Sequence, residues 1–261
     1  MSKEPTVSTE AIDLPGLGAL TVVDLAQPLT ETTPTIQLPE PFANTPPFRL
    51  HEISRYDERG PVSYWNWFEC GEHVGTHLDA PNHWVSGQGG RPVDEIPLRQ
   101  LVAPAVVIDR TDEAAADPDY LLGLEDVRAF EAEHGPLPEG GWLLYRTGWS
   151  RYAQDQEQFL NADESGAHTP GIQAECARWL AEESGIIGIG VETVGTDAGQ
   201  AFELDPVFPV HHYMHGAGKL GLTQLANLDR LPATGTTLAA APLKIEGGSG
   251  SPTRVYGLLP R

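Results

Sequence analysis

Alternating and continuous apolar runs along the chain predict six β-strands. These stretches are rich in β-branched and aromatic residues and are bounded by Gly, Pro, Asp or Asn, as strands of globular domains usually are. The predicted strands are residues 20–25, 62–70, 102–109, 142–147, 186–191 and 236–245. The segment 186–191 is apolar apart from its glycines, a pattern typical of a strand that is buried on both faces.

Two other segments repeat apolar residues at helical spacing. Residues 124–134 do so and are followed by a Gly-Pro pair, which ends helices. For the second helix we expect Thr169 as the N-cap, Pro170 at the first helical position and Gly185 beyond the last turn. The residues that would share its apolar face are Ile172, Cys176, Trp179 and Leu180.

Because strands alternate with helices and outnumber them, the predicted fold is one mixed α/β domain that spans residues 1–261. The longer polar segments are interpreted as loops, at residues 111–120, 134–141, 155–169, 195–206 and 246–252. Long loops inside a compact domain often carry function.

The charge balance limits the partners that we expect. The 261 residues hold 16 Lys and Arg against 37 Asp and Glu, a formal net charge of −21. This balance opposes binding to nucleic acid phosphates or to anionic lipid. No apolar run approaches the ~20 residues of a membrane span, and the N-terminal stretch has no apolar leader core. The only cysteines, Cys70 and Cys176, lack metal-type spacing, which favours reduced thiols in the cytoplasm.

Candidate chemistry is concentrated in residues 73–84. His73 and His77 have the i, i+4 spacing of metal-binding helices, but a glycine, a threonine and a proline in the window oppose a helix. In an extended chain His73, His77 and Asp79 share one face, with the two histidine Cα atoms ~13 Å apart. Two facing imidazoles barely span that gap, so the chain must bend between them, and Gly75 permits the bend.

His73, His77 and Asp79 would then form a ligand set with positions left open for water and substrate. Two imidazoles and a carboxylate suit a divalent first-row ion such as Zn²⁺ or Mn²⁺. His83 would close the site as a fourth ligand. As a non-ligand near the metal it is a candidate general base, because imidazole titrates near neutrality. The alternative is a set of polar residues on a surface hairpin.

A second group of histidines comprises His211, His212 and His215. We expect one of them to add a metal ligand or a hydrogen bond to substrate, with the other two as bystanders.

Trp65 and Trp67 share a face of the predicted strand 62–70 by alternation. If that strand continued unbroken to His73, the same face would carry the metal ligands. With Trp84 nearby, the indoles would then suit a flat aromatic substrate, although two indoles on one face are also typical of a core.

Other catalytic motifs are missing from the sequence. The glycines at 188 and 190 lack the third glycine of a dinucleotide fingerprint, and the glycines at 247–250 are not followed by Lys-Ser or Lys-Thr. No serine lies in a Gly-x-Ser-x-Gly elbow, which removes the usual serine-hydrolase route.

The segment 73–83 matches the pattern HxGTHxDxPxH. It resembles the signature of the cyclase family of metal-dependent amide hydrolases, which includes bacterial kynurenine formamidase. The similarity extends over nearly the whole chain, through residues 65–67, 161–164, 195–200, 226–229 and 240–246. These runs resemble the isatin-hydrolysing branch more closely than the formamidase branch.

The resemblance implies a swivelling β/β/α domain, usually oligomeric, with active-site aromatics that sometimes cross the subunit interface. It also implies Mn²⁺ as the metal. Formamidases of this family bind a second ion through a later histidine and a glutamate just before an asparagine. Here the residue before Asn227 is Ala226, so we expect one metal per chain and His211 free to orient substrate. Gln224 stands where the isatin-hydrolysing branch has serine, which leaves proton handling open.

The expected reaction is metal-dependent hydrolysis of a cyclic amide, isatin to isatinate. His83 would take the proton of the attacking water and pass it to the leaving nitrogen. The ring would be held by Trp65, Trp67, Trp84 and His211. One alternative is hydrolysis of N-formylkynurenine, the same chemistry on an open-chain arylformamide. Another is a metal- or ligand-binding protein without turnover, against which the presence of His83 counts. The expected assembly is a homodimer or a higher homo-oligomer.

Overall fold

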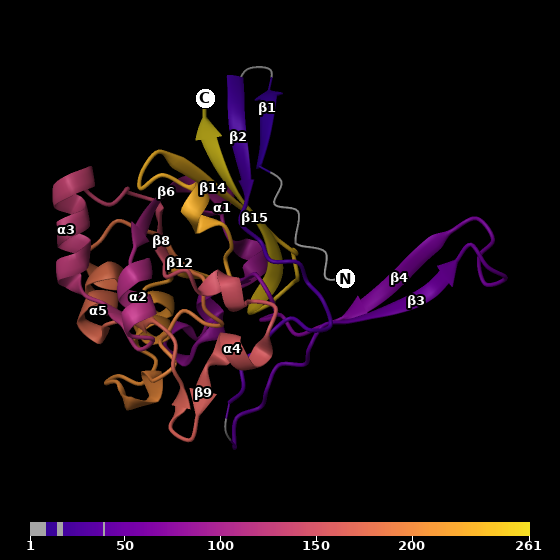
Figure 1. The fold of residues 1–261 in the computed structure, drawn as a ribbon, viewed down its shortest axis with the longest axis horizontal. Coiled ribbons are helices and arrows are strands. Elements are labelled where there is room, and N and C mark those ends of the chain that lie inside the picture. The colour runs from indigo at the N-terminus through magenta and orange to yellow at the C-terminus, as the bar shows by residue number, and fades with distance from the viewer. Residues whose placement is uncertain (1–8, 15–17, 39) are drawn as a thin grey trace.

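The computed structural model describes residues 9–14, 18–38 and 40–261, so the first eight residues of the stretch searched for a leader lie outside it. Its main feature is a nine-stranded mixed sheet, in which β15 also pairs with β5. The strands are, in order across the sheet, β1 (Thr9–Leu14), β2 (Gly18–Asp24), β15 (Gly250–Pro260), β14 (Thr236–Pro242), β6 (Val102–Asp109), β8 (Trp142–Arg146), β12 (Gly188–Val191), β13 (Leu220–Thr223) and β5 (His77–Asp79). The extra pairing closes seven of them into a barrel-like sheet, beyond which β1 and β2 extend (Figure 1).

Helices lie mainly on one side of this sheet (Figure 1). Neighbouring strands β6, β8, β12 and β13 are parallel, as expected where helical segments connect them. The helices are α1 (Leu98–Leu101), α2 (Thr111–Ala116), α3 (Leu124–His134), α4 (Gln156–Leu160) and α5 (Ala174–Glu182). Single 3-10 turns span Pro81–His83, Val85–Gly87, Val93–Glu95, Trp149–Tyr152, Ala201–Glu203 and Leu228–Arg230, and a π-helical turn spans His211–His215.

Strand alternation divides the apolar residues between two cores. Val107 and Leu144 pack in the barrel interior with Leu222. Their neighbours Val106 and Leu143 point to the other face, where they pack against α3 and α5. Successive strand side chains face opposite ways, so the apolar runs read from the sequence serve both cores. The mixed α/β fold class is therefore confirmed.

All six predicted strands are present, with ends shifted by a few residues, and α3 has the predicted bounds. The predicted start of the second helix is wrong. Thr169 and Pro170 precede a short strand, β11 (Gly171–Ile172), which pairs in parallel with β7 (Leu121–Leu122), and α5 begins only at Ala174. The backbone of Ile172 is paired across this bridge, which removes that residue from the helix although it stays buried.

Three predicted loops contain α-helices or strands. Residues 111–120 include α2, and residues 155–169 include α4 and a small hairpin of β9 (Ala162–Asp163) and β10 (Gly166–Ala167). Residues 246–252 run into β15, the longest strand. Among the described residues, no helix has both the length and the apolar content to cross a bilayer.

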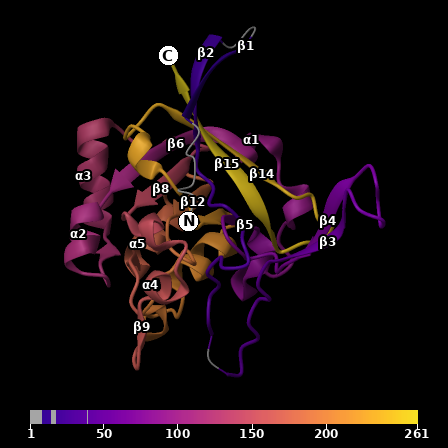
Figure 2. The ribbon, with the colours of Figure 1, turned by 45° about the vertical axis from the view of Figure 1, so that its right-hand side comes forward.

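A hairpin of β3 (Arg49–Arg55) and β4 (Tyr64–Glu69) projects from the body of the molecule (Figures 1 and 2). It carries many of the large apolar side chains that are exposed in the described residues. They are Leu50, Tyr56, Val62, Tyr64, Trp65, Trp67 and Phe68. An exposed patch of this kind is typical of an interaction surface.

Candidate active site

The short strand β5 places His77 and Asp79 in the closed part of the sheet. It lies between β13 and β15, with Asp79 opposite Gly221 on one side and Gly250 on the other. Both side chains are buried. The predicted bend is confirmed, because Gly75 has a φ of 65° and residues 72–76 turn before the strand begins. This turn brings His73 back toward β5.

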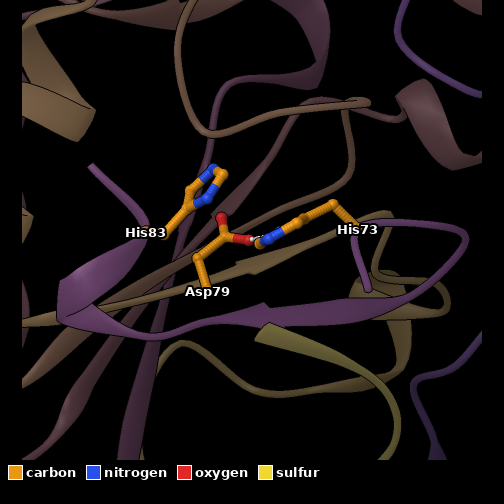
Figure 3. Close-up of side chains that lie close together, drawn as sticks. All are labelled: His73, Asp79 and His83. Carbon is orange, nitrogen blue, oxygen red and sulfur yellow. Dashed lines mark hydrogen bonds and ion pairs between the residues drawn. The ribbon is translucent and has the colours of Figure 1, made fainter. Parts of the chain in front are cut away.

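His73 and His77 both approach one oxygen of Asp79. His73 Nδ1 lies 2.7 Å and His77 Nε2 3.3 Å from Asp79 Oδ1. The three residues predicted as metal ligands are thus brought together. Figure 3 shows the imidazoles of His73 and His83 beside the Asp79 carboxylate.

Neighbouring polar groups orient both imidazoles. His77 Nδ1 lies 2.7 Å from Gly75 O, and a carbonyl can only accept, so Nδ1 carries a hydrogen, and Nε2 holds the lone pair whenever the ring is neutral. The Thr223 hydroxyl lies 2.8 Å from the same Nδ1. His73 Nε2 lies 2.9 Å from Ser249 Oγ, which donates to Glu72. Such outer contacts fix ring orientation at metal sites.

Burial and charge set the protonation of the centre. Burial alone would raise the pKa of Asp79, but the neighbouring charge of His77 and hydrogen bonds from His73 and His77 hold that pKa well below its ordinary value. Burial lowers the pKa of His83 to about 3 and that of His215 to about 4. Asp79 is therefore an anion, and His83 and His215 are neutral imidazoles at neutral pH.

His83 lies over the centre on the turn Pro81–His83. Its ring stacks on His73, with centroids 3.9 Å apart, and lies 5.5 Å from the ring of His211. The ring of Trp84 packs on His211 at 4.6 Å. The predicted base thus lies beside both the ligand group and an aromatic wall.

His211 begins the π-helical turn, and Asp197 anchors it. Asp197 accepts hydrogen bonds from the backbone N–H groups of Val210 and His211, and its Oδ2 lies 2.5 Å from His211 Nδ1. Burial alone would lower the pKa of His211, but the bond to Asp197 raises it. Of the other histidines in this turn, His215 also faces the centre, whereas His212 packs on Tyr213.

Among the residues that the structure describes, two groups of donor atoms could hold a metal ion, and they share Asp79. One is His73, Asp79 and His83, and the other is Asp79, His211 and His215, each with donor atoms within 4.8 Å of one another. His77 belongs to neither group. His215 Nε2 is buried and has no hydrogen-bond partner among the described residues, so a cation would satisfy it. Neutral imidazoles around a buried carboxylate fit a divalent first-row ion.

A cavity of about 380 Å³ opens onto this centre. That volume is in the usual range of small-molecule sites. The predicted site residues that line it are His73, His77, Asp79, His83, Trp84 and His211. Phe42, Phe202 and Phe208 add aromatic wall that the sequence analysis missed, and no local motif marks them.

Trp65 and Trp67 do not line this cavity. They lie on the projecting hairpin and are 57% and 50% exposed, with Trp67 stacked on His51. The strand does not continue unbroken to His73, because β4 ends at Glu69 and the chain turns before His73. Strand alternation therefore does not carry the tryptophans to the ligand face.

Ala226 also is not among the residues that line the cavity at the histidines. It lines a separate cavity with Asp24 and Glu192, and its N–H donates to Leu25 O. Gln224 is buried, with its backbone carbonyl accepting from Thr76 Oγ1 and its side-chain amide directed to Pro34 O.

The structure adds several residues that the sequence analysis did not assign. Asp197 had a detectable signal, because it lies in the family-like run 195–200. Thr223, Ser249 and Glu72 had none, since they reach the histidines only through strand pairing and turns.

Comparison with known proteins gives consistent matches. Residues 23–198 match the Cyclase family, described as "Putative cyclase". Isatin hydrolase from Roseibium aggregatum is 47% identical over 257 residues, which cover 95% of this chain and 97% of that protein. Kynurenine formamidase from Salinibacter ruber is 32% identical over 70% of this chain and 74% of that protein.

Solved structures of isatin hydrolases and of a metal-dependent hydrolase are also similar to this structure. An isatin hydrolase bound to the product analogue thioisatinate has a TM-score of 0.89 and 47% identity, over 93% of both chains. Isatin hydrolase A from Labrenzia aggregata, bound to benzyl benzoate, has a TM-score of 0.90 and 48% identity, over 93% of this chain and 94% of that one. A protein described as a "predicted metal-dependent hydrolase" from Bacillus stearothermophilus has a TM-score of 0.66 and 25% identity, over 92% of this chain and 99% of that one.

Proposed function

The chain belongs to the Cyclase family, and from that premise we propose that it hydrolyses the cyclic amide of isatin to give isatinate. The observation that carries the proposal is one cavity in which an aromatic wall faces a buried carboxylate and four histidines. Its relatives that are 47% identical over nearly the full chain are isatin hydrolases. As part of the proposal, residues 1–261 act as one domain.

We assign His73, His77 and Asp79 as ligands of one divalent ion per chain, with Mn²⁺ as the first choice and Zn²⁺ as the second. The hydrogen bond of His77 Nδ1 to Gly75 O supports the assignment because it directs Nε2 toward Asp79 Oδ1. When bound, such an ion polarises the amide carbonyl and makes a water molecule more acidic. Metal-dependent hydrolysis is also the activity named for a structural neighbour.

We assign proton transfer to His83. Its ring, stacked on His73 and facing the cavity, is placed to accept the proton of the attacking water and to return it to the amide nitrogen as the substrate ring opens. His211, held by Asp197, points its other nitrogen toward the cavity and can donate a hydrogen bond to a substrate oxygen. Asp197 orients His211 and so acts as a positioning residue.

The cavity wall supports a flat, uncharged substrate. Trp84 and Phe208, with rings 5.4 Å apart, offer apolar surface for a benzo ring. No Lys or Arg lines the cavity in the described part of the chain. The α-carboxylate of N-formylkynurenine would therefore find no Lys or Arg to pair with, which disfavours the formamidase alternative. A binder without turnover is disfavoured by the placement of His83.

Turnover decides between these functions. Protein reconstituted with Mn²⁺ or Zn²⁺ is assayed on isatin, N-formylkynurenine and a simple imide. We expect the highest kcat/KM for isatin. A higher value for N-formylkynurenine would reassign the chain to the formamidases, and binding of isatin without turnover would make it a binding protein.

The proposal includes self-association through the β3–β4 hairpin and a cytoplasmic location. The apolar side chains on the hairpin support self-association, since in one chain Trp65 and Trp67 cover neither a core nor the cavity. In an oligomer they could meet the cavity of a neighbouring copy. Two free cysteines support a reducing compartment.

A further inference from the structure

A second cavity adjoins the one at the histidines. It has a volume of about 610 Å³ and extends from His211 to the β9–β10 hairpin. The two cavities share lining residues, among them Gly195, Phe202, Phe208 and His211. The catalytic cavity therefore continues into a larger space than a bicyclic substrate such as isatin needs.

Gly195 marks the junction between the two cavities. It lines both, and a Cβ atom built on it would meet no other atom within 4 Å. A side chain at this position therefore has open space at its Cβ atom, next to residues that line both cavities. We expect a larger residue here to narrow the space that the two cavities share.

The second cavity has an apolar near side and an acidic mouth. Ile36, Leu160 and Val194 line the near part, and the exposed Glu164 and Glu203 lie at the outer edge. No Lys or Arg lines either cavity within the described ranges. In a chain with a net charge of −21, this surface favours apolar groups and opposes anions.

We propose that the second cavity is a distal subsite of the catalytic centre. It takes an extension carried by an aromatic cyclic amide larger than isatin, with an apolar stem next to the ring and an end that is neutral or positively charged. The inference rests on the proposed function, because the amide must lie at the histidines for its extension to reach past Gly195. The wall of the second cavity then determines specificity, whereas the histidine centre determines the reaction.

A matched series of substrates tests the subsite. Isatin is compared with isatins that bear a butyl, a 4-aminobutyl or a 3-carboxypropyl chain, at the ring nitrogen in one series and at C5 in a second. We expect the butyl and aminobutyl compounds of at least one series to exceed isatin at least tenfold in kcat/KM, with the carboxypropyl compound at least tenfold below them.

Different results would reject the proposed function and the proposed subsite. If isatin itself is not hydrolysed, the proposed function is wrong. If isatin is hydrolysed but no chain in either series improves kcat/KM, or the acid chain performs as well as the amine, the subsite alone is rejected.

Variants locate the effect in the second cavity. Gly195→Leu should remove the advantage of the butyl compound over isatin, whereas Gly195→Ala should keep most of it. Glu164→Lys with Glu203→Lys, both exposed, should raise the carboxypropyl rate at least tenfold relative to the aminobutyl rate. An unchanged selectivity in the double charge variant contradicts the proposal even if Gly195→Leu fails to fold.

Discussion

At the scale of single residues, His83 separates metal binding from turnover. His83→Ala should keep the metal and lose ~10²–10⁴ in kcat, the usual contribution of a positioned acid or base. His73→Ala, His77→Ala and Asp79→Ala should each lose the metal, because each removes an assigned ligand. Metal content by elemental analysis and kcat on isatin are measured for the same preparations.

The substitution of His83 distinguishes a metal ligand from a general base. His83 stacks on His73 and shares a donor group with Asp79, so it is close enough to be a ligand itself. Release of the metal by His83→Ala would show that His83 is a ligand, and the assignment of His83 as the base would then be wrong.

Two buried threonines offer a matched pair of substitutions. Thr223→Val removes the hydroxyl beside His77 and should weaken metal binding ~10–100-fold, as loss of an orienting contact does. Thr236→Val removes a buried hydroxyl that has no partner among the described residues. It should leave metal affinity unchanged and stabilise the fold by about 1 kcal/mol.

The measurements are metal titration and urea unfolding of both variants. Equal metal affinity in the two would mean that Thr223 does not orient His77. A Thr236→Val variant that loses about 1 kcal/mol would show that its hydroxyl has a partner, such as a water molecule.

At the scale of elements, Asp126 ties helix α3 to the sheet. It accepts from the N–H of Gly123 at 2.8 Å and from Tyr120 Oη at 2.9 Å, and Arg110 Nε donates to it at 3.1 Å. Burial alone would raise its pKa, but the bonds from Gly123, Tyr120 and Arg110 lower it. Its folded pKa thus lies below the unfolded value, so its stabilisation is present above about pH 4 and is lost as the pH falls through the folded pKa.

Asp126→Asn should therefore lose about 1–2 kcal/mol of unfolding free energy at pH 7, because charge-assisted bonds become neutral ones. The difference from the unmodified protein should shrink as the pH falls below about 4. Urea unfolding between pH 3 and 7 measures it. Glu125→Gln, on an exposed position of the same first turn, is the control and should change little. A deficit that is constant with pH would contradict the linkage.

Elements also show where sequence reasoning works. Helix α3 has the predicted bounds because its signals are local, in its periodic apolar residues and its terminal Gly-Pro. Strand β5 has three residues, and Gly250–Pro252 at the start of β15 looks like a loop. β5 is a strand because it pairs with β13 and β15, and Gly250–Pro252 because they pair with β5, which no local pattern reveals.

The residues of the candidate site also divide into those that a local pattern predicts and those that only distant contacts bring in. His73, His77, Asp79 and His83 lie within eleven residues, so their chemistry could be predicted together. The bond of Asp197 to His211 spans fourteen residues, and that of Ser249 to His73 spans 176. Alternation does not carry Trp65 and Trp67 to the ligand face, because the chain turns after Glu69.

At the scale of the whole molecule, metal stoichiometry tests the proposed centre. The two donor groups share Asp79, and three protein ligands suffice for a catalytic ion. We expect one divalent ion per chain from elemental analysis of reconstituted protein. Two tightly held ions would place the second at Asp79, His211 and His215, and His215→Ala should then remove only that ion.

The hairpin gives the last prediction. If Trp67 meets the cavity of a neighbouring copy, Trp67→Ala should mainly raise KM, because ring contact is present in both ground and transition states. The expected loss is ~1–3 kcal/mol, or ~5–150-fold in kcat/KM. Specific activity of the unmodified protein should also fall on dilution, in parallel with dissociation measured by sedimentation. Leu98→Ala, at an apolar position that is 80% exposed on α1, is the control and should change neither.

Mixing variants distinguishes a contact between copies from one within a chain. His83→Ala retains Trp67, and Trp67→Ala retains His83, so a mixed oligomer contains sites in which a His83-bearing cavity meets a Trp67-bearing hairpin. If the hairpin acts between copies, the mixture should exceed the summed activity of the two variants, because only mixed oligomers restore a complete site. Activity that is independent of dilution, together with no gain on mixing, would confine the tryptophans to the surface of their own chain and leave Trp84 and the phenylalanines as the ring contacts.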